Sequence, residues 1–421
     1  MGGSTMKQRY DSYKPSGIDW IGDIPSHWSV MPVKHVLDNL DYLRQPISAE
    51  DRERNNPKYD YYGASGVIDQ IDFYNVDDTV LLIGEDGANL VMRNLPLIYR
   101  ASGKFWVNNH AHILKPKNGH NYSYLAHLLE AGDYTLFITG SAQPKLSQEN
   151  LNKYPICIPP LAEQEAIAAW LDEKCEEIDA AIAKVDREIE LIDELKQSEI
   201  SRVVTRGLNP DTPLRPSGID WIGDIPEHWT KCRLKFIGSA RNGLTYSPSD
   251  VKDSGKLVIR SSNIQDSKLN YDDCVFVANY PETLSVNSGD TIICSRNGSI
   301  NLIGKSVFIE DDMDVTFGAF MMRFRPYEHP KYSHYLLSIA ISRYKGLFAT
   351  TTINQLTADS LGKMEAVMPP YMEQVQIADY LDKKCAAIDG LKAKLIKKRE
   401  TLTELRQSII SEVVTGKRKV I

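Results

Sequence analysis

A stretch of sequence that occurs twice constrains this chain more than any other feature. Residues Pro15–Trp28 return as Pro216–Trp229 with a single change, Ser26 to Glu227. A match this close means that the protein contains two copies of one unit. The repeated stretch, here called the Trp motif, is rich in Gly, Asp and Pro and holds two Trp residues. This composition favours tight turns with buried Trp side chains, so we expect a structural element and not a functional site.

A second repeat lies downstream of each Trp motif. The pattern Pro-Pro-x-x-Glu-Gln occurs at 159–164 and at 369–374, and the match continues without a gap to Val-Val-Thr at 203–205 and 413–415. No Pro interrupts either segment, and each begins directly after a Pro, which is typical of a helix start. The spacing therefore predicts long helices at 161–207 and 371–421. Their apolar residues recur at heptad-like spacing: Ile178, Ile182, Val185, Ile189 and Ile192 in one, and Ile388, Leu391, Leu395, Leu402, Leu405 and Ile409 in the other.

The charges of the two predicted helices are opposite. Residues 161–207 contain 13 acidic and 6 basic side chains, whereas residues 371–421 contain 7 acidic and 11 basic ones. This imbalance favours pairing of the two different helices over pairing of either with itself. Two independently solvated helices with an accidental imbalance are the alternative.

The remaining segments have a different character. Short β-like runs at 79–83 and 291–294 are bounded by Gly, Asn and Asp, and helical runs occur near 122–130 and 332–344. The sequence thus predicts an α+β protein in which two mixed domains and two long helices form an internal repeat. The expected boundaries are a leading segment at 1–28, a domain at 29–160, a helix at 161–207, a linker with the second Trp motif at 208–229, a domain at 230–370 and a helix at 371–421.

Composition excludes several classes of protein. No apolar run approaches the ~20 residues that cross a membrane, and no basic flank with an apolar core begins the chain. The 6 Cys residues form no Cys-x-x-Cys pair, so we expect reduced thiols, no metal site and a cytoplasmic protein.

Three motifs resemble catalytic or metal-binding patterns but lack an essential part. Met-Pro-Pro-Tyr at 368–371 has the form of an amino-methyltransferase loop, yet Met368 cannot hold a target amine as Asn or Asp would. Gly298 and Gly304-Lys305-Ser306 are spaced one residue too far apart for a phosphate-binding loop. His110 and His112 have no further ligand at suitable spacing. We therefore expect no catalytic residue and no bound cofactor in this chain.

Polar loops after the β-like runs are better candidates for recognition. Amide and Arg side chains read base edges, and hydroxyl and Lys groups hold phosphates. The candidate DNA-binding residues in the first domain are Ser65, Glu85, Asp86, Asn89, Asn108, His110, Gln143, Lys145 and Ser147. Those in the second are Arg260, Ser262, Asn263, Arg296, Asn297, Ser299, Thr351, Thr352, Asn354 and Gln355.

Net charge limits how strongly such loops could bind nucleic acid unaided. The chain carries a formal charge of −7; residues 29–153 contain 12 basic and 15 acidic side chains, and residues 230–363 contain 16 and 13. Electrostatic binding by this chain alone should therefore be modest. Either the chain does not bind DNA, or partner subunits add the positive charge.

Together these features resemble the specificity subunit of type I restriction–modification enzymes. The Trp motifs, Gly-Ser-Ala-Gln-Pro-Lys-Leu-Ser at 140–147, the Pro-Pro-x-x-Glu-Gln helix starts and the duplicated order carry the resemblance. It implies two target recognition domains, each reading one half of a split DNA sequence, held apart by two antiparallel helices. It also implies two modification subunits that bring S-adenosylmethionine and methylate adenine, and two restriction subunits that use ATP and Mg²⁺.

Two other classes of function stay open at this stage. The chain could be a coiled-coil scaffold whose two domains bind protein, or an enzyme with an undetected site. Sequence-selective DNA binding by the full complex, and the activity of the purified chain, distinguish these alternatives.

Overall fold

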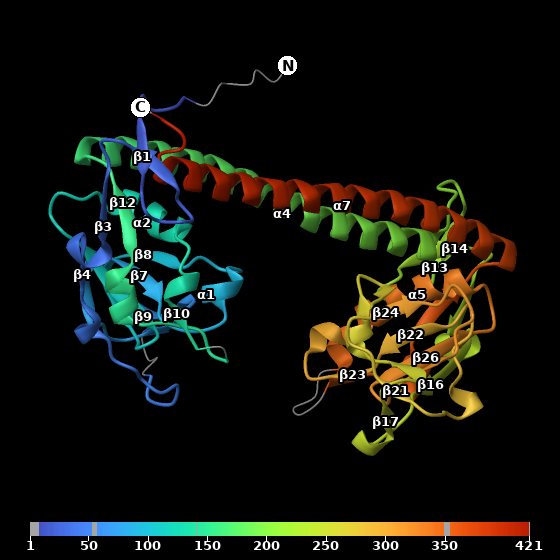
Figure 1. The fold of residues 1–421 in the computed structure, drawn as a ribbon. Helices are drawn as coiled ribbons and strands as arrows, with labels where there is room; N and C mark the ends of the chain where they lie inside the picture. The colour runs from blue at the N-terminus through green and yellow to red at the C-terminus, as the bar shows by residue number, and fades with distance from the viewer. Residues whose placement is uncertain (1–7, 53–56, 141, 349–353, 421) are drawn as a thin grey trace. The chain divides into compact units, whose positions relative to one another are not determined.

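A computed structural model describes residues 8–52, 57–140, 142–348 and 354–420 of the chain (Figure 1). The chain divides into two compact units. Unit 1 is formed by residues 1–186 and 396–421, and unit 2 by residues 187–395. Each unit thus contains one Trp motif, one mixed domain and a part of both long helices.

The two long helices are α4 (Leu161–Arg206) and α7 (Tyr371–Val414). Both begin directly after the Pro-Pro pairs, as the sequence predicts. Helix α7 ends before the predicted limit at residue 421, and Gly416 follows it with a φ of 72°. A Cβ atom at this position would lie 2.3 Å from Cδ of Pro25, so glycine is required both for the left-handed turn and for the close approach.

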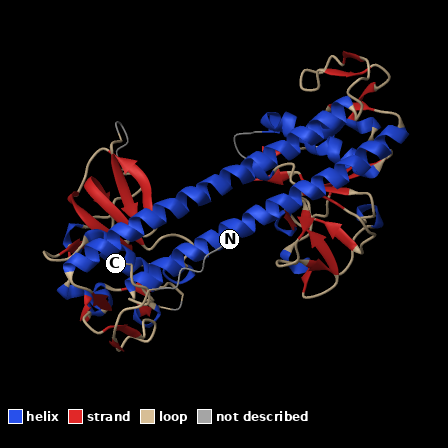
Figure 2. Ribbon diagram, turned by 90° about the horizontal axis from the view of Figure 1, so that it is seen from above, coloured by secondary structure: helices blue, strands red, loops and turns tan. Residues whose placement is uncertain are grey.

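Within each unit the two helices run antiparallel, and Figure 2 shows them side by side. In unit 1, Arg406 contacts Asp179 at 2.8 Å and Arg399 contacts Asp186 at 3.4 Å. In unit 2, Lys392 contacts Asp193 at 2.7 Å, and Lys196 contacts Asp389 at 2.6 Å. Residue numbers rise along α4 as they fall along α7, which defines the antiparallel register. The predicted pairing of two oppositely charged helices is confirmed.

The apolar stripe predicted along the helices is buried only in part. Ile178 and Val185 are buried, whereas Leu391 and Leu405 are 51 % and 46 % exposed. Leu391 and Leu405, although included in the heptad-like spacing, therefore lie outside the buried seam. A pair of helices covers one narrow face of each partner, so apolar residues beside that face remain at the surface.

The domain of unit 1 is built on a six-stranded sheet, with all neighbours antiparallel except β5 and β8. In sheet order the strands are β4 (Leu37–Asn39), β9 (Ala111–Pro116), β7 (Val76–Gly84), β8 (Ile98–Val107), β5 (Tyr59–Gly63) and β6 (Gly66–Ile71). The helices are α1 (Asn89–Met92), α2 (Tyr122–Ala131) and α3 (Gln148–Lys153). Short strand pairs complete the unit: β1 (Tyr13–Pro15) with β2 (Asp23–Pro25), β3 (Ser29–Pro32) with β12 (Pro155–Ile158), and β10 (Ile138–Thr139) with β11 (Lys145–Leu146).

The domain of unit 2 contains two four-stranded sheets. One has the order β16 (Gly238–Asn242), β26 (Met321–Pro326), β22 (Thr291–Cys294), β24 (Ser306–Phe308); the other has β17 (Val251–Lys252), β21 (Phe276–Val277), β18 (Lys256–Ile259), β25 (Val315–Phe317). Short pairs are β13 (Leu214–Pro216) with β14 (Asp224–Pro226), β15 (Thr230–Arg233) with β28 (Glu365–Met368), β19 (Ile264–Gln265) with β20 (Lys268–Leu269), and β23 (Arg296–Asn297) with β27 (Asn354–Gln355). The helices are α5 (Pro330–Tyr344) and α6 (Ala358–Lys363).

The two domains share more structure than their sequences indicate. The order β4-β9-β7-β8 in unit 1 corresponds to β16-β26-β22-β24 in unit 2. The register is also shared, because Gly84 pairs with Ala111 and Cys294 pairs with Met321 at the same end of the two central strand pairs. In unit 1 this sheet continues through β5 and β6, whereas in unit 2 the remaining strands form a separate sheet.

The Trp motif and the Pro-Pro-x-x-Glu-Gln motif contact each other in both units. In unit 1, Glu163 accepts a hydrogen bond from Nε1 of Trp28 at 3.1 Å and lies 2.8 Å from Nε2 of His27. In unit 2, Glu373 bonds in the same way to Trp229, at 2.9 Å. Both Trp side chains are buried. The two repeated motifs therefore form one anchor that joins a domain to the start of a long helix.

Candidate nucleic-acid interface

Four predicted residues of unit 1 meet where strand β7 ends. The amide of Glu85 donates to the carbonyl of His110 at 2.8 Å, and the amide of Leu146 donates to the carbonyl of Glu85 at 2.7 Å. Asp86 and Lys145 form an isolated backbone bridge. We call Glu85, Asp86, His110 and Lys145 loop cluster 1. The structure thus brings together predicted residues that are up to 60 positions apart in sequence.

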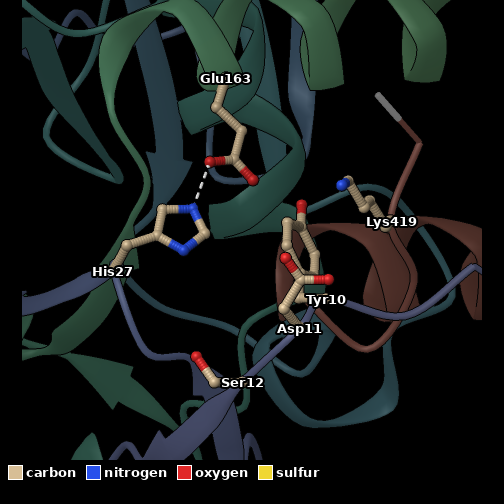
Figure 3. Close-up of a pocket in the computed structure, with 6 residues that line it drawn as sticks. All are labelled: Tyr10, Asp11, Ser12, His27, Glu163 and Lys419. Atoms are coloured by element: carbon tan, nitrogen blue, oxygen red, sulfur yellow. Dashed lines mark hydrogen bonds and ion pairs between the residues drawn. The ribbon is translucent and has the colours of Figure 1, made fainter.

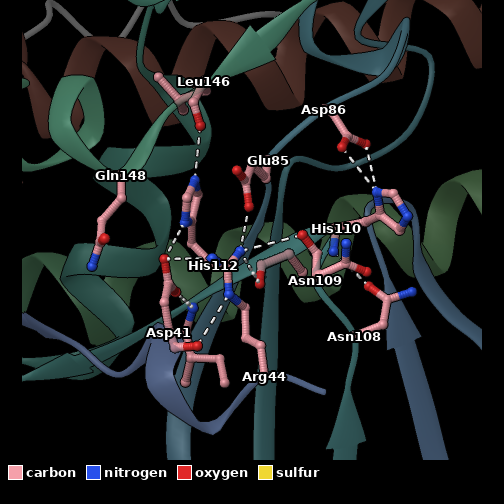
Figure 4. A network of polar contacts seen from close by, with 12 residues as sticks. Asp41, Arg44, Glu85, Asp86, Asn108, Asn109, His110, His112, Leu146 and Gln148 are labelled. Atoms are coloured by element: carbon pink, nitrogen blue, oxygen red, sulfur yellow. Dashed lines mark hydrogen bonds and ion pairs between the residues drawn. The ribbon is translucent and has the colours of Figure 1, made fainter. Parts of the chain in front are cut away.

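A buried ionic network supports loop cluster 1 (Figure 4). Glu85, only 8 % exposed, accepts from the guanidinium group of Arg44 and lies 3.0 Å from Nζ of Lys145. Asp41 bonds to Nδ1 of His112 at 2.6 Å and to the amide of Ile113 at 2.9 Å. Figure 4 shows Asp41, Arg44, Glu85 and His112 close together. Glu85 therefore holds the loop in place and leaves little of its own surface for a ligand.

Charge pairing in this network keeps both carboxyl groups ionised. Burial tends to raise the pKa of Glu85, but the bonds to Arg44 and Lys145 outweigh it and hold that pKa below its usual value. Burial likewise opposes ionisation of Asp41, yet the bonds to His112 and Ile113 hold its pKa below the usual range. Because both pKa values are lowered, the two carboxylates that support the loop are charged at neutral pH.

Asp86 and His110 form a separate pair at the surface. Nδ1 of His110 lies 2.8 and 3.1 Å from the two carboxylate oxygens of Asp86. The His110 side chain is 48 % exposed and that of Asp86 is 17 % exposed. This pair, unlike Glu85, has polar atoms that a ligand can reach.

An equivalent cluster exists in unit 2. The amide of Ser295 donates to the carbonyl of Phe320 at 2.9 Å, and the amide of Leu356 donates to the carbonyl of Ser295 at 2.7 Å. Strands β23 and β27 pair Arg296 with Gln355 and Asn297 with Asn354. We call Arg296, Asn297, Phe320 and Gln355 loop cluster 2. The guanidinium carbon of Arg296 lies 5.3 Å from the ring centroid of Phe320, within cation–π range.

The other predicted residues of unit 1 surround loop cluster 1 or stabilise its turns. Ser65 and Gln143 are exposed. Asn108 is 5 % exposed and accepts from the amide of His110. Asn89 accepts from the amide of Leu95 and closes the loop around α1. Ser147 caps helix α3 by accepting from the amide of Asn150.

The other predicted residues of unit 2 are divided in the same way. Arg260 is paired with Asp273 at 2.7 Å, and Asn263, 1 % exposed, donates to the carbonyls of Asn270 and Asp273. Ser262 and Ser299 are exposed. Thr351 and Thr352 lie outside the described residues.

Sequence reasoning missed four residues of these sites: Asp41, Arg44, His112 and Phe320. Asp41 and Arg44 lie far from the other cluster residues in sequence, and nothing in their local pattern marks them. His112 was considered only as a metal ligand, and it is fully buried between Asp41 and the carbonyl of Leu146. A signal for Phe320 was available, because it stands 210 positions after His110, the offset of the second repeat.

A cavity of about 430 Å³ lies beside the anchor of unit 1 (Figure 3). It is lined by Tyr10, Asp11, Ser12, His27, Glu163 and Lys419. Figure 3 shows His27 and Glu163 turned toward each other, so the best-placed acidic group is already engaged. The cavity is an open hollow beside the anchor, and we assign no ligand to it.

The described part of the chain contains no cluster of three or more His, Cys, Asp or Glu side chains arranged to hold a metal ion. Its helices include none that is long and apolar enough to cross a membrane. Gly304 is followed by strand β24 and not by a helix, which agrees with rejection of a phosphate-binding loop there.

The fold and the candidate site define a class of protein: a duplicated protein whose two domains share one four-strand order and carry loop clusters of different chemistry. Comparison with known proteins identifies this class further. The family described as the type I restriction modification DNA specificity domain matches residues 25–191 and again residues 226–399.

Similar proteins carry the same description. A putative type I restriction enzyme specificity subunit of Haemophilus influenzae is 27 % identical over 360 residues, covering 84 % of this chain and 86 % of that protein. A putative specificity subunit of Methanocaldococcus jannaschii is 23 % identical and covers 95 % and 96 %. A chain from a solved structure on assembly of the type I R-M system matches with a TM-score of 0.65 at 16 % identity, covering 93 % of this chain and 98 % of that one.

The chain belongs to the type I restriction–modification specificity subunits. It is a non-catalytic, DNA-recognising component of such a system, and DNA and other subunits of the system are its partners. The fold class expected from the sequence, two mixed domains with two long antiparallel helices, is confirmed.

Proposed function

We propose that each unit of this specificity subunit reads one half of a split DNA sequence. The observation that carries the proposal is the pair of loop clusters. Both occupy the same end of the same four-strand order, and both join three chain segments through equivalent backbone hydrogen bonds. Their side chains differ, which is what two different half-sites require. Direct readout depends on side-chain donors and acceptors, while the backbone fixes only where they are presented.

The paired helices are proposed to set the unspecified spacer between the half-sites. Helices α4 and α7 each continue from one unit into the other. An α-helix has a fixed rise of ~1.5 Å per residue, so its length is a reliable ruler. The cross-helix ion pairs fix the register in which the two helices can act.

Partner subunits complete the proposed function. Two modification subunits would bind S-adenosylmethionine and methylate adenine, and two restriction subunits would bind ATP and Mg²⁺. The net charge of −7 supports this division, because a chain of this charge needs additional cationic surface to hold the DNA backbone firmly. Cytoplasmic localisation is part of the same proposal.

The test is reconstitution of the chain with the modification subunits of its own system, followed by mapping of methylated adenines in a genome. We expect one split sequence with two defined halves. A complex that selects no DNA sequence would favour the scaffold alternative. Methyltransferase or nuclease turnover by the purified chain, abolished by a point substitution within it, would favour the enzyme alternative.

A further inference from the structure

Two side-chain pairs occupy the same place in the two loop clusters. The carbonyls of His110 and Phe320 accept from the amides of Glu85 and Ser295, at 2.8 and 2.9 Å. The residues that follow these amides are Asp86 and Arg296, and both bridge to the segment before α3 or α6. Asp86–His110 in unit 1 is therefore the structural counterpart of Arg296–Phe320 in unit 2. The residue types differ at both positions: Asp86 corresponds to Arg296, and His110 corresponds to Phe320.

The two pairs present opposite hydrogen-bonding chemistry. Nδ1 of His110 faces the carboxylate of Asp86 and so carries the hydrogen. In the neutral ring, Nε2 is then an acceptor, and the carboxylate oxygens are acceptors as well. Arg296 offers only donors, since a guanidinium group has no acceptor.

Each pair is also held in a fixed orientation. The hydrogen bond to Asp86 aligns the His110 ring, whose side chain is 48 % exposed. The Phe320 ring, 58 % exposed, lies beside the Arg296 guanidinium group, whose carbon is 5.3 Å from the ring centroid. Among the described residues, no carboxylate is paired with the Arg296 guanidinium. A guanidinium group in cation–π contact with a ring can still form two parallel hydrogen bonds through its edge.

We propose that these two pairs determine one base in each half-site and demand opposite base chemistry there. Arg296, supported by Phe320, selects guanine through its N7 and O6 acceptors. His110, oriented by Asp86, selects a base with an exocyclic amino group in the major groove, adenine or cytosine. This inference rests on the proposed function, which it deepens by naming the residues that distinguish the half-sites.

The experiment uses the complex of the full chain with its modification subunits and two duplex libraries, each with one half-site randomised. Sequencing of methylated duplexes gives the base preference at every position. Arg296→Ala should reduce the preference for guanine at one position of one half-site by roughly tenfold or more. His110→Ala should reduce the preference for adenine or cytosine at one position of the other half-site.

Matched variants separate readout from charge and from folding. Arg296→Lys keeps the charge but loses the planar fork, so it should relax the same position as Arg296→Ala. Phe320→Leu removes the ring and should relax that position to a smaller extent. Lys268→Ala, at an exposed position on β20, is the control and should change neither half-site. The unaltered half-site reports in every variant that the complex is assembled.

The outcomes are distinct. A uniform loss of methylation on all sequences of the affected half-site would make Arg296 a phosphate contact and overturn the inference. Unchanged preferences in both variants would overturn it as well. A wild-type complex that prefers no sequence in either library would instead refute the proposed function itself.

Discussion

Units 1 and 2 attach their domains to the long helices in the same way, although the domains differ in residue content. In unit 1, Asp172 of α4 contacts Nε2 of His127 at 2.8 Å and Arg100 at 3.0 Å. In unit 2, Asp382 of α7 accepts from Lys331 and from the hydroxyl of Tyr335, both at 2.8 Å. The acidic residue on the helix is kept, while its domain partners are exchanged for others of similar hydrogen-bonding capacity.

The loop clusters differ far more than these attachments. A buried ionic network lies under loop cluster 1, whereas the position of Glu85 is taken in unit 2 by Ser295, whose hydroxyl donates to the carbonyl of Phe320 at 3.1 Å. The comparison shows that attaching a domain to the long helices and presenting the side chains of a loop cluster are separate tasks. Attachment keeps the acidic residue on the helix and two hydrogen-bonding partners in the domain, while the loop clusters keep the backbone hydrogen bonds and change their outer side chains.

The largest expected effect comes from lengthening one helix without the other. Four residues inserted between Lys398 and Arg399 of α7 alone put the cross-helix ion pairs of unit 1 out of register with those of unit 2. Either the ion pairs or the packing of Gly416 against Trp28 must then be lost. We expect a loss of more than about 3 kcal/mol in the free energy of unfolding, the scale of disrupting a packed core. Urea denaturation measures it.

The matched control lengthens both helices. Four further residues between Asp186 and Arg187 of α4 restore the register and add about 6 Å to each helix. The protein should fold, and the spacer of the recognised DNA should lengthen by one to two base pairs, since duplex DNA rises ~3.4 Å per base pair. Genome-wide mapping of methylated adenines gives the spacer. An unchanged spacer, or altered half-sites, would refute the role of the helices as a ruler.

The second prediction compares the two anchors. The side chain of Glu163 is 9 % exposed and that of Glu373 is 35 % exposed, although both bond to a Trp and a His. Glu163→Ala leaves the buried Nε1–H of Trp28 without a partner and should cost about 2–3 kcal/mol. Glu373→Ala should cost only about 1 kcal/mol, because water can replace the carboxylate. Hydrogen exchange of the amides in the strand pairs β3–β12 and β15–β28 reports the stability of each unit separately. Equal losses of stability in the two variants would contradict the prediction.

The third prediction concerns acid sensitivity, which should be greater in loop cluster 1. Asp41 and Glu85 have pKa values below those of the unfolded chain, so their stabilisation is complete above the unfolded values. It is lost as the pH falls from about 4 through the lower folded values. The equivalent of Glu85 in unit 2 is Ser295, which does not titrate. Amide exchange at 81–86, corrected for intrinsic rates, should therefore accelerate below this pH more than exchange at 291–296.

Substituting Glu85 supplies the control for acid sensitivity. Glu85→Gln removes one of the two titrating groups and should reduce the pH dependence at 81–86 while leaving 291–296 unaffected. The same pH dependence in both segments of the wild-type chain would show that a global transition, and not this network, is being titrated.

The smallest expected effects are those of the cross-helix ion pairs. Asp179–Arg406 and Asp389–Lys196 occupy matching places in the repeat and have similar side-chain exposures, 52 % with 33 % and 52 % with 26 %. Double-mutant cycles should give an interaction energy of about 0.2–1 kcal/mol for each ion pair. The two values should be nearly equal, and salt should reduce both. Asp186–Arg399, at 3.4 Å, should contribute less. A difference of more than about 1 kcal/mol between the first two pairs would break the equivalence of the helix ends.

The sequence by itself determined the duplication, the two long helices and their pairing, and the strands and short helices near residues 79, 122, 291 and 332. Each of these leaves a local signal: an identical stretch, a Pro-free heptad pattern, opposite charge, or a short apolar run between turn residues. It also indicated most of the surface loops, since Glu85, Asp86, Arg296 and Gln355 stand directly beside recognisable elements.

Only the tertiary structure decided that the two domains share one four-strand order, that Arg44 supports loop cluster 1 and that Phe320 belongs to loop cluster 2. Strand register depends on which apolar residues become buried together, and many different sequences satisfy that condition, so sequence similarity fades while the sheet persists. Hydrogen bonds such as those joining Glu85 to His110 and Ser295 to Phe320 connect positions distant along the chain. Their partners are chosen by folding, because no local pattern of residues encodes a contact made across a sheet.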